Sequence, residues 1–187
     1  MLIDAPDFEV TDEVRILALQ GDWDLEKKVG PAGGKYVIAE PERAHQACMT
    51  FFDLVTNSDA HIAILPELTI PVGTVPHIIA AVKGLTRSLV FLGGVEGISQ
   101  EQYKNLLDGV EGEPQALARD ETGDYVNSVL MIVKTPSSFT VRLRAKRVAS
   151  RPENLNGLPM ARGAGPFVTI RLGTKPVTTV SGCGHDP

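Results

Sequence analysis

Apolar runs of strand length alternate with amphipathic helical patterns through the first half of the chain. The apolar runs lie at Val14–Gln20, 62–65 and Ser88–Gly94, and the first of them is expected to be a central strand. Helical spacing of apolar side chains occupies 41–55 and 74–85 between them. Four consecutive apolar residues at 62–65 favour a strand that is covered on both faces. Short connections between such strands favour parallel neighbours with right-handed crossovers. The pattern therefore predicts an α/β fold.

Each of the two predicted helices contains one residue of a type that is often catalytic or metal-binding. Pro41 suits the first turn of a helix, and Cys48 falls on its apolar face. A small thiol on such a face favours a packing role. Thr74 is a candidate cap for the second helix, and His77 lies beside its apolar face. We interpret His77 as a partly buried histidine, because no second ligand stands at metal spacing.

The remaining segments are expected to be a surface loop, a short helix and a hairpin. Glycine, proline and charged residues over 21–34 are typical of a surface loop. Ser99 and Gln102 form a capping box that predicts a short helix after Ser99. Two further strands are expected over 125–133 and 139–145, paired as an antiparallel hairpin.

Three polar features stand out, and each has an ordinary structural explanation beside a functional one. Glu67 follows Pro66 at the end of a strand, where open α/β sheets bind ligands, yet it also fits a solvated loop. Cys183 lies between two glycines just after an apolar run, which is the setting of a nucleophile on a tight turn. The ordinary explanation is an unstructured terminus. Strand alternation puts Arg142, Arg144 and Lys146 on one face, and Arg147 and Arg151 follow the strand. This basic cluster fits a solvated strand face and loop equally well.

Composition limits the classes of function. The 187 residues are 43% hydrophobic, which suits one domain with a sizeable core. A net charge of −5 gives no electrostatic reason to expect nucleic acid or a membrane as partner. No apolar run reaches membrane-spanning length, and the two cysteines lie far apart, which is typical of a reducing compartment. We therefore expect a cytoplasmic protein.

Taken together, these motifs resemble those of the nitrilase, or carbon-nitrogen hydrolase, superfamily. The family's Glu motif looks like Ile64–Leu68, its Lys motif like Arg144–Arg147, and its Cys motif like Thr179–Cys183. The separations between the three motifs are similar to those usual in the family. Tyr125–Ser128 likewise resembles the stretch that opens the family's hairpin. The resemblance covers almost the whole chain.

The resemblance implies a Glu-Lys-Cys triad in an α-β-β-α sandwich. Cys183 would attack the carbon of a nitrile or amide and form a thioester, and Lys146 would stabilise the thiolate and the oxyanion. Glu67 would accept the thiol proton, pass it to the leaving ammonia or amine, and then activate water. Glu153 matches the family's second glutamate, which orients the substrate or the lysine. No cofactor is implied.

The chain also departs from the family pattern after Cys183. Gly184 and His185 stand where the family usually has an aromatic residue and an acid. The family's fold normally continues well past its cysteine. We therefore expect residues 1–187 to form a single carbon-nitrogen hydrolase-like domain that is C-terminally incomplete. Uncovered surfaces would then favour a homo-oligomer or association with the missing C-terminal part.

Two other classes of function remain open. The first alternative is a non-catalytic nitrilase-like interaction module, or an inactive fragment of a larger protein, that keeps the motifs. A third reading takes Cys183, His185 and Asp186 as metal ligands, but these residues lie too close together without a distant partner, so no metal site is expected. The specific nitrile or amide substrate is not readable from one sequence.

Overall fold

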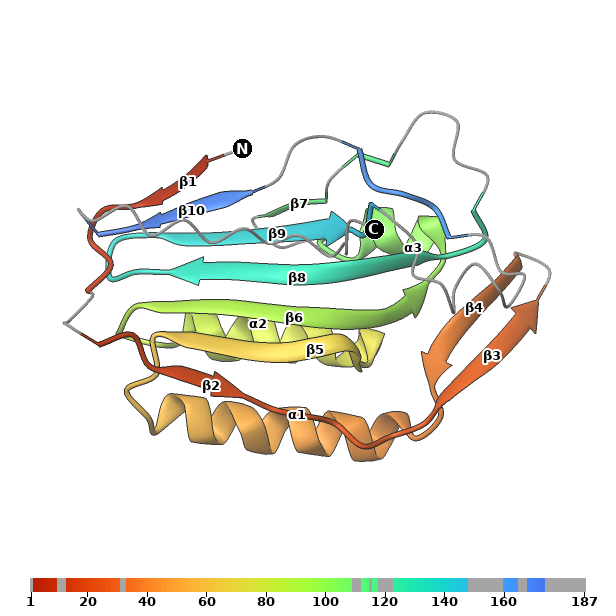
Figure 1. Cartoon of the computed structure of the whole chain (residues 1–187), viewed down its shortest axis with the longest axis horizontal. Coiled ribbons are helices and arrows are strands. Elements are labelled where there is room, and N and C mark those ends of the chain that lie inside the picture. Colours follow the sequence, from red (N-terminus) through yellow and green to blue (C-terminus); the bar gives the residue numbers. More distant parts are fainter. Residues whose placement is uncertain are drawn as a thin grey trace.

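The chain has a mixed α/β fold built on one large sheet (Figure 1). The computed structural model describes residues 2–9, 13–30, 33–108, 112–114, 116–117, 123–147, 160–164 and 168–173. Its helices are α1 (Pro41–Thr56), the 3-10 turn η1 (Val72–Thr74), α2 (Val75–Lys83) and α3 (Gln100–Asn105). Its strands are β1 (Leu2–Ala5), β2 (Ile16–Ala18), β3 (Leu25–Gly30), β4 (Gly33–Ile38), β5 (Ile62–Ile70), β6 (Leu89–Ile98), β7 (Gly112–Pro114), β8 (Val126–Lys134), β9 (Phe139–Ala145) and β10 (Thr169–Leu172).

The large sheet has the order β2-β5-β6-β8-β9-β7. Its first three strands are parallel, as the alternation of strands and helices predicts. From β6 onward the chain turns back on itself, because β8 pairs antiparallel with both β6 and β9. The antiparallel hairpin β8–β9 confirms the one predicted from the sequence. The sheet thus combines three parallel strands with an antiparallel segment around β8, and β7 at its edge pairs parallel with β9.

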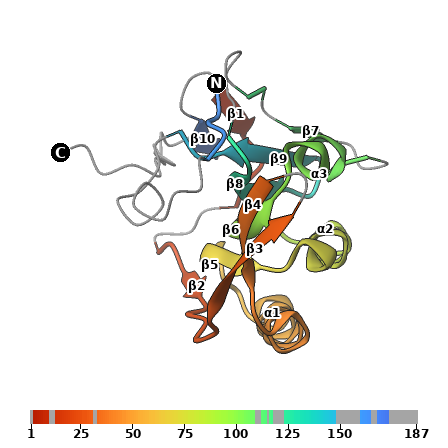
Figure 2. The same ribbon diagram turned by 90° about the vertical axis from the view of Figure 1, so that its right-hand side faces the viewer.

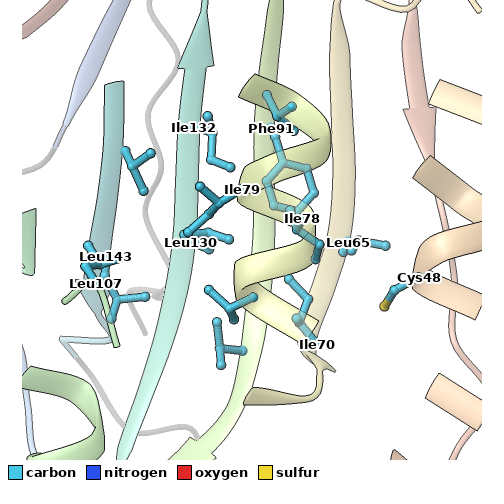
Figure 3. Packing of buried hydrophobic residues seen from close by; sticks show 14 of the residues in the cluster. Cys48, Leu65, Ile70, Ile78, Ile79, Phe91, Leu107, Leu130, Ile132 and Leu143 are labelled. Atoms are coloured by element: carbon cyan, nitrogen blue, oxygen red, sulfur yellow. The ribbon is translucent and has the colours of Figure 1, made fainter. Parts of the chain in front are cut away.

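The helices all pack on one face of this sheet (Figure 2). Side chains from α1 and α2 meet alternate residues of the central strands and form the main core. Figure 3 shows Ile78 and Ile79 of α2 over Phe91 of β6 and Ile132 of β8. Phe91 and Ile132 are fully buried. Burial of these apolar side chains supplies the main stabilisation of the fold.

The opposite face carries a smaller core. There β1 and β10 form a two-stranded parallel sheet and pack over one end of β5, β6 and β8. Ile62, Val90 and Met131 belong to this second cluster. Ile64 and Leu92, further along the same face, are only partly buried. The face opposite the helices is therefore less completely covered than the helical face within the described residues.

The predicted helices are present, with one difference at a cap. Helix α1 begins at Pro41 and buries Cys48, as predicted. The capping box of Ser99 and Gln102 is also present at the start of α3. Thr74 precedes α2 without capping it, because its hydroxyl pairs with the Nδ1 atom of His45 at 2.9 Å. The side chain of Thr74 therefore links α1 to α2.

Two sequence interpretations are corrected. The run Val14–Gln20 was expected to be a central strand, but β2 has three residues and pairs only with β5 in the described part of the chain. Ile16 is 58% exposed there, so an apolar run does not by itself specify a neighbour on both sides. The expected loop over 21–34 instead contains β3 and leads into β4 as an antiparallel hairpin. Gly30 and Gly33 form the last pair of this ladder.

Among the described residues, no helix is both long enough and apolar enough to cross a membrane.

Candidate active site

Glu67 projects from a bulge in β5. The strand pairs with β6 through Leu65 and Gly93, and pairing resumes only at Ile70 and Val95. Between these two pairs the chain advances five residues in β5 but only two in β6, so the intervening part of β5 must leave the regular ladder. Within this bulge Leu68 has a φ of 54°, which side-chain-bearing residues rarely adopt. The bulge re-aims the segment that carries Glu67, although the apolar run itself continues through Pro66 as strand.

Gly94 of β6 makes room for this bulge. A Cβ atom at Gly94 would lie 2.5 Å from the Cα of Glu67 and 2.5 Å from the carbonyl oxygen of Pro66. Both contacts are to backbone, which cannot rotate away. Gly94 follows Leu92 in alternation, so the bulge lies over the face opposite the helices. Gly94, the last residue of the apolar run that predicts this strand, therefore has a specific role in positioning Glu67.

Lys146 directly follows β9, which β6 and β8 separate from β5, and it lies on the same face of the sheet as Glu67. Its backbone N–H donates to the carbonyl of Asn127 at 2.7 Å, which extends the β8–β9 ladder by one residue. Its own carbonyl accepts from the N–H of Gly163 at 3.0 Å. Strand alternation then places Lys146 on the face that Arg142 and Arg144 share, as the sequence predicted. The backbone on both sides of Lys146 is thus held by hydrogen bonds.

The two side chains meet although 79 residues separate them in the sequence. The Nζ atom of Lys146 donates to the Oε1 atom of Glu67 at 2.5 Å, and the Nδ2 atom of Asn127 donates to the same oxygen, also at 2.5 Å. The side chain of Lys146 is 6% exposed, whereas that of Glu67 is 44% exposed. No hydrogen bond within the described residues involves Oε2 of Glu67. One carboxylate oxygen is therefore anchored and the other is open.

A buried carboxylate holds the chain just after the bulge. Glu96 is 7% exposed and accepts from the N–H of Val72 at 2.7 Å and from the N–H of Ile38 at 3.1 Å. It thereby ties the segment that follows β5 to the β3–β4 hairpin. Each oxygen of this carboxylate has a backbone donor, which offsets the cost of burying the charge. Glu96 thus helps to fix the backbone that follows the Glu67 bulge.

The arrangement suits proton transfer next to a fixed positive charge. A nearly buried ammonium group needs a close counter-charge, and Glu67 provides it. The Oε2 atom is available to exchange a proton with a group that approaches from the face opposite the helices. Lys146 would stabilise negative charge that develops beside it, because a desolvated ammonium interacts strongly with an oxyanion. Glu67 and Lys146, two of the predicted catalytic residues, are therefore brought together.

The other predicted site residues are placed as follows. Cys183 and Glu153 lie outside the described residues, as do His185 and Asp186. Cys48 is fully buried under the helices, and burial raises the pKa of its thiol to about 11, so it is a packing residue as predicted. His77, which was expected to be partly buried, is instead exposed, and its ring lies 5.2 Å from that of His45. Within the described ranges no group of three or more His, Cys, Asp or Glu side chains could hold a metal ion.

Sequence reasoning missed the role of Asn127. It was noted only as part of a motif, whereas the structure places it 2% exposed and hydrogen-bonded to Glu67. The available signal was a pair of polar residues, Asn127 and Ser128, inside an otherwise apolar strand. A buried polar side chain requires a partner, so such a pair indicates a site on at least one face of the sheet.

No protein-family model matches this chain, and no curated protein or solved structure matches it either.

Proposed function

We propose that this chain is a thiol hydrolase of non-peptide C–N bonds, with Glu67, Lys146 and Cys183 as its catalytic residues. The substrate class is a nitrile or an amide, which is converted to an acid with release of ammonia or an amine. The proposal joins the resemblance to the nitrilase superfamily with the geometry of the site. It also includes the family's α-β-β-α sandwich, of which the helix-covered sheet would form one half.

The observation that carries the proposal is the contact between Lys146 and Glu67. Glu67 lies in β5 and Lys146 directly follows β9, and these two strands are not neighbours in the sheet. A structural ion pair would not require one carboxylate oxygen to stay open. Here Asn127 and Lys146 both bind Oε1, whereas Oε2 forms no hydrogen bond with the described residues. This asymmetry is what a general base needs.

For an amide substrate, the proposed reaction has two halves. Oε2 of Glu67 takes the thiol proton of Cys183 while the sulfur forms a bond to the carbonyl carbon. The oxyanion of the tetrahedral intermediate lies beside the ammonium of Lys146. When the C–N bond breaks, Glu67 gives its proton to the leaving nitrogen. Water then attacks the thioester, Glu67 accepts its proton and returns it to the thiol, and the free acid leaves.

A thiol-labelling experiment tests whether the site assembles. A limiting alkylating agent at neutral pH is added to the parent protein, Lys146→Met, Glu67→Gln and Cys183→Ala, and intact mass is followed with time. We expect one fast adduct in the parent, absent from Cys183→Ala and slowed at least about tenfold in Lys146→Met, because the ammonium stabilises the thiolate. Cys48 stays unlabelled because its thiol is buried and its pKa is raised to about 11.

Lys83→Met is the matched control, since Lys83 is an exposed lysine at the end of α2, on the opposite face of the sheet. Its labelling rate should equal that of the parent. Equal rates in the parent and Lys146→Met would contradict the proposal and favour a non-catalytic interaction module. Where labelling is fast, release of ammonia from a panel of amides and nitriles then identifies the substrate.

A further inference from the structure

Two histidines meet between helices α1 and α2, which lie on the face of the sheet opposite the one that carries Glu67 (Figure 2). No second metal ligand stands close to His77 in the sequence, but the fold brings His45 of α1 beside it. The two ring centroids are 5.2 Å apart and the ring planes are inclined at 76°. His45 is partly buried and His77 is exposed, so solvent can reach the pair.

Both rings are held through their Nδ1 atoms. Nδ1 of His77 donates to the carbonyl oxygen of Gly73 at 3.2 Å, and because a carbonyl only accepts, the lone pair of this ring lies on Nε2. Nδ1 of His45 pairs with the hydroxyl of Thr74 at 2.9 Å, and a hydroxyl can accept from a ring N–H. Neither Nε2 atom has a hydrogen-bond partner among the described residues. This is how metal-binding histidines are usually oriented, with one nitrogen held by an oxygen acceptor and the other left for the ion.

One turn of the chain orients both rings. Gly73 and Thr74 are consecutive residues of η1, which leads directly into α2. The side chain of Thr74 is buried, and its N–H donates to the carbonyl of Pro71 at 2.9 Å, so its hydroxyl has a fixed place. The two oxygen acceptors therefore keep a constant distance from each other, and the rings that they hold are pre-organised.

The separation of the rings suits two ligands of one metal ion. A histidine nitrogen lies about 2.0–2.1 Å from a bound zinc ion, and the ring centre lies about 1.1 Å behind that nitrogen. Two such rings on a tetrahedral ion have centroids about 5 Å apart, which agrees with the observed 5.2 Å. An edge-to-face contact between aromatic rings has a similar spacing. That contact alone gives no reason for one turn to hold both Nδ1 atoms.

We propose that the Nε2 atoms of His45 and His77 bind one divalent transition-metal ion of the class of Cu²⁺, Ni²⁺ and Zn²⁺, with water completing the coordination. Imidazole ligands suit these ions, whereas Mg²⁺ and Ca²⁺ take oxygen ligands. Two protein ligands agree with the absence of any larger group of candidate ligands among the described residues. The ion would link α1 to α2 and stabilise the folded state, because the unfolded chain does not hold the two rings together. This site is independent of the proposed hydrolase function.

Pulsed electron paramagnetic resonance of bound Cu²⁺ tests the site, because the echo modulation reports how many imidazoles bind the ion. Cu²⁺ is the divalent ion expected to bind most tightly. One equivalent is added to the Cys183→Ala protein, which lacks a thiol that could reduce the ion. We expect the modulation pattern of two imidazoles. Adding His45→Gln or His77→Gln should leave the pattern of at most one, and glutamine in place of His45 can still pair with the hydroxyl of Thr74.

His61→Gln in the same background is the matched control. His61 is also partly buried and lies just before β5, where its Nδ1 atom accepts from the N–H of Arg15 at 3.1 Å. Its replacement should leave the two-imidazole pattern unchanged. The inference is overturned if Cys183→Ala shows no such pattern, or if the pattern survives the loss of either His45 or His77.

Calorimetric titration with Zn²⁺ in the same background measures what each group contributes. His77→Gln should lower the affinity at least about tenfold, because the second ligand no longer binds at a high effective concentration. His77 is exposed, so its replacement leaves the apolar core intact. Thr74→Val keeps the volume of the buried side chain but removes the acceptor for His45, and it should cost about tenfold in affinity. Equal affinities in Cys183→Ala and its His77→Gln variant, or no binding to either, would refute the site.

Discussion

The two faces of the large sheet differ in what they bury. On the helical face α1 and α2 cover a continuous apolar core, in which Cys48 is fully enclosed. On the opposite face the apolar residues gather near β1 and β10, and polar groups occupy the other end. There Asn127 and Lys146 are buried against Glu67, whose side chain is nearly half exposed.

This difference indicates which face of such a sheet can carry reactive polar side chains. The core on the helical face is built mainly from apolar side chains, so a charge there would lose hydration without compensation. The other face offers a bulge, hydrogen-bonding partners and partial access to solvent. Two residues of one strand can therefore have opposite roles, because alternation sends them to different faces. Three experiments test this contrast.

The largest effect is expected from two neighbouring residues on β6 that face opposite ways. Phe91→Ala removes a fully buried ring from the helical core and should lower the free energy of unfolding by about 3–5 kcal/mol. Leu92→Ala removes a partly buried side chain from the other face and should cost only about 1 kcal/mol. Urea unfolding of both variants measures the difference. Equal losses would show that the two faces are equally well packed.

Gly94→Ala tests the support of the Glu67 bulge. The new methyl group would collide with backbone atoms of Pro66 and Glu67, so we expect a loss of about 3 kcal/mol. Gly73→Ala is the matched control, because no atom lies within 4 Å of its Cβ position, and its effect should stay within about 0.5 kcal/mol. Gly94→Ala should also slow the labelling of Cys183. A neutral effect would mean that the bulge does not depend on Gly94.

The smallest effect concerns pH and the helical face. Burial raises the pKa of Cys48 from 9.0 to about 11, so the folded state favours the neutral thiol. The stabilisation is therefore complete below about pH 9 and is lost as pH rises toward about 11, with a magnitude of about 2 kcal/mol. Urea unfolding at pH 8 and pH 11 should show a larger decline in the parent than in Cys48→Ala. Identical declines would contradict the burial of this thiol.

Much of the fold could be predicted from local patterns. The helix that begins at Pro41, the capping box at Ser99 and the hairpin β8–β9 follow from spacing and turn chemistry that act over a few residues. The hairpin β3–β4 was missed because its glycines and charges are equally typical of a loop. The edge position of β2 was missed because strand order depends on contacts distant in sequence.

The residues of the candidate site likewise divide into those that sequence motifs indicate and those that only the structure reveals. Glu67 and Lys146 could be chosen from motifs that resemble a known family, and their contact was then found in the structure. The roles of Asn127 and Gly94 could not be derived from sequence, because each depends on what a different strand places beside it. Cys183 and Glu153 lie outside the described residues, so their assignment stays a prediction.

By itself, the sequence determined the elements and the residue types that chemistry needs, because hydrophobic period, caps and turns act locally. Only the tertiary structure decided that one oxygen of Glu67 binds both Asn127 and Lys146, while the other binds no group in the described part of the chain. That outcome depends on the register of three strands and on a bulge that a glycine admits. Register and bulge arise from the packing of the whole sheet, which no single stretch of the chain encodes.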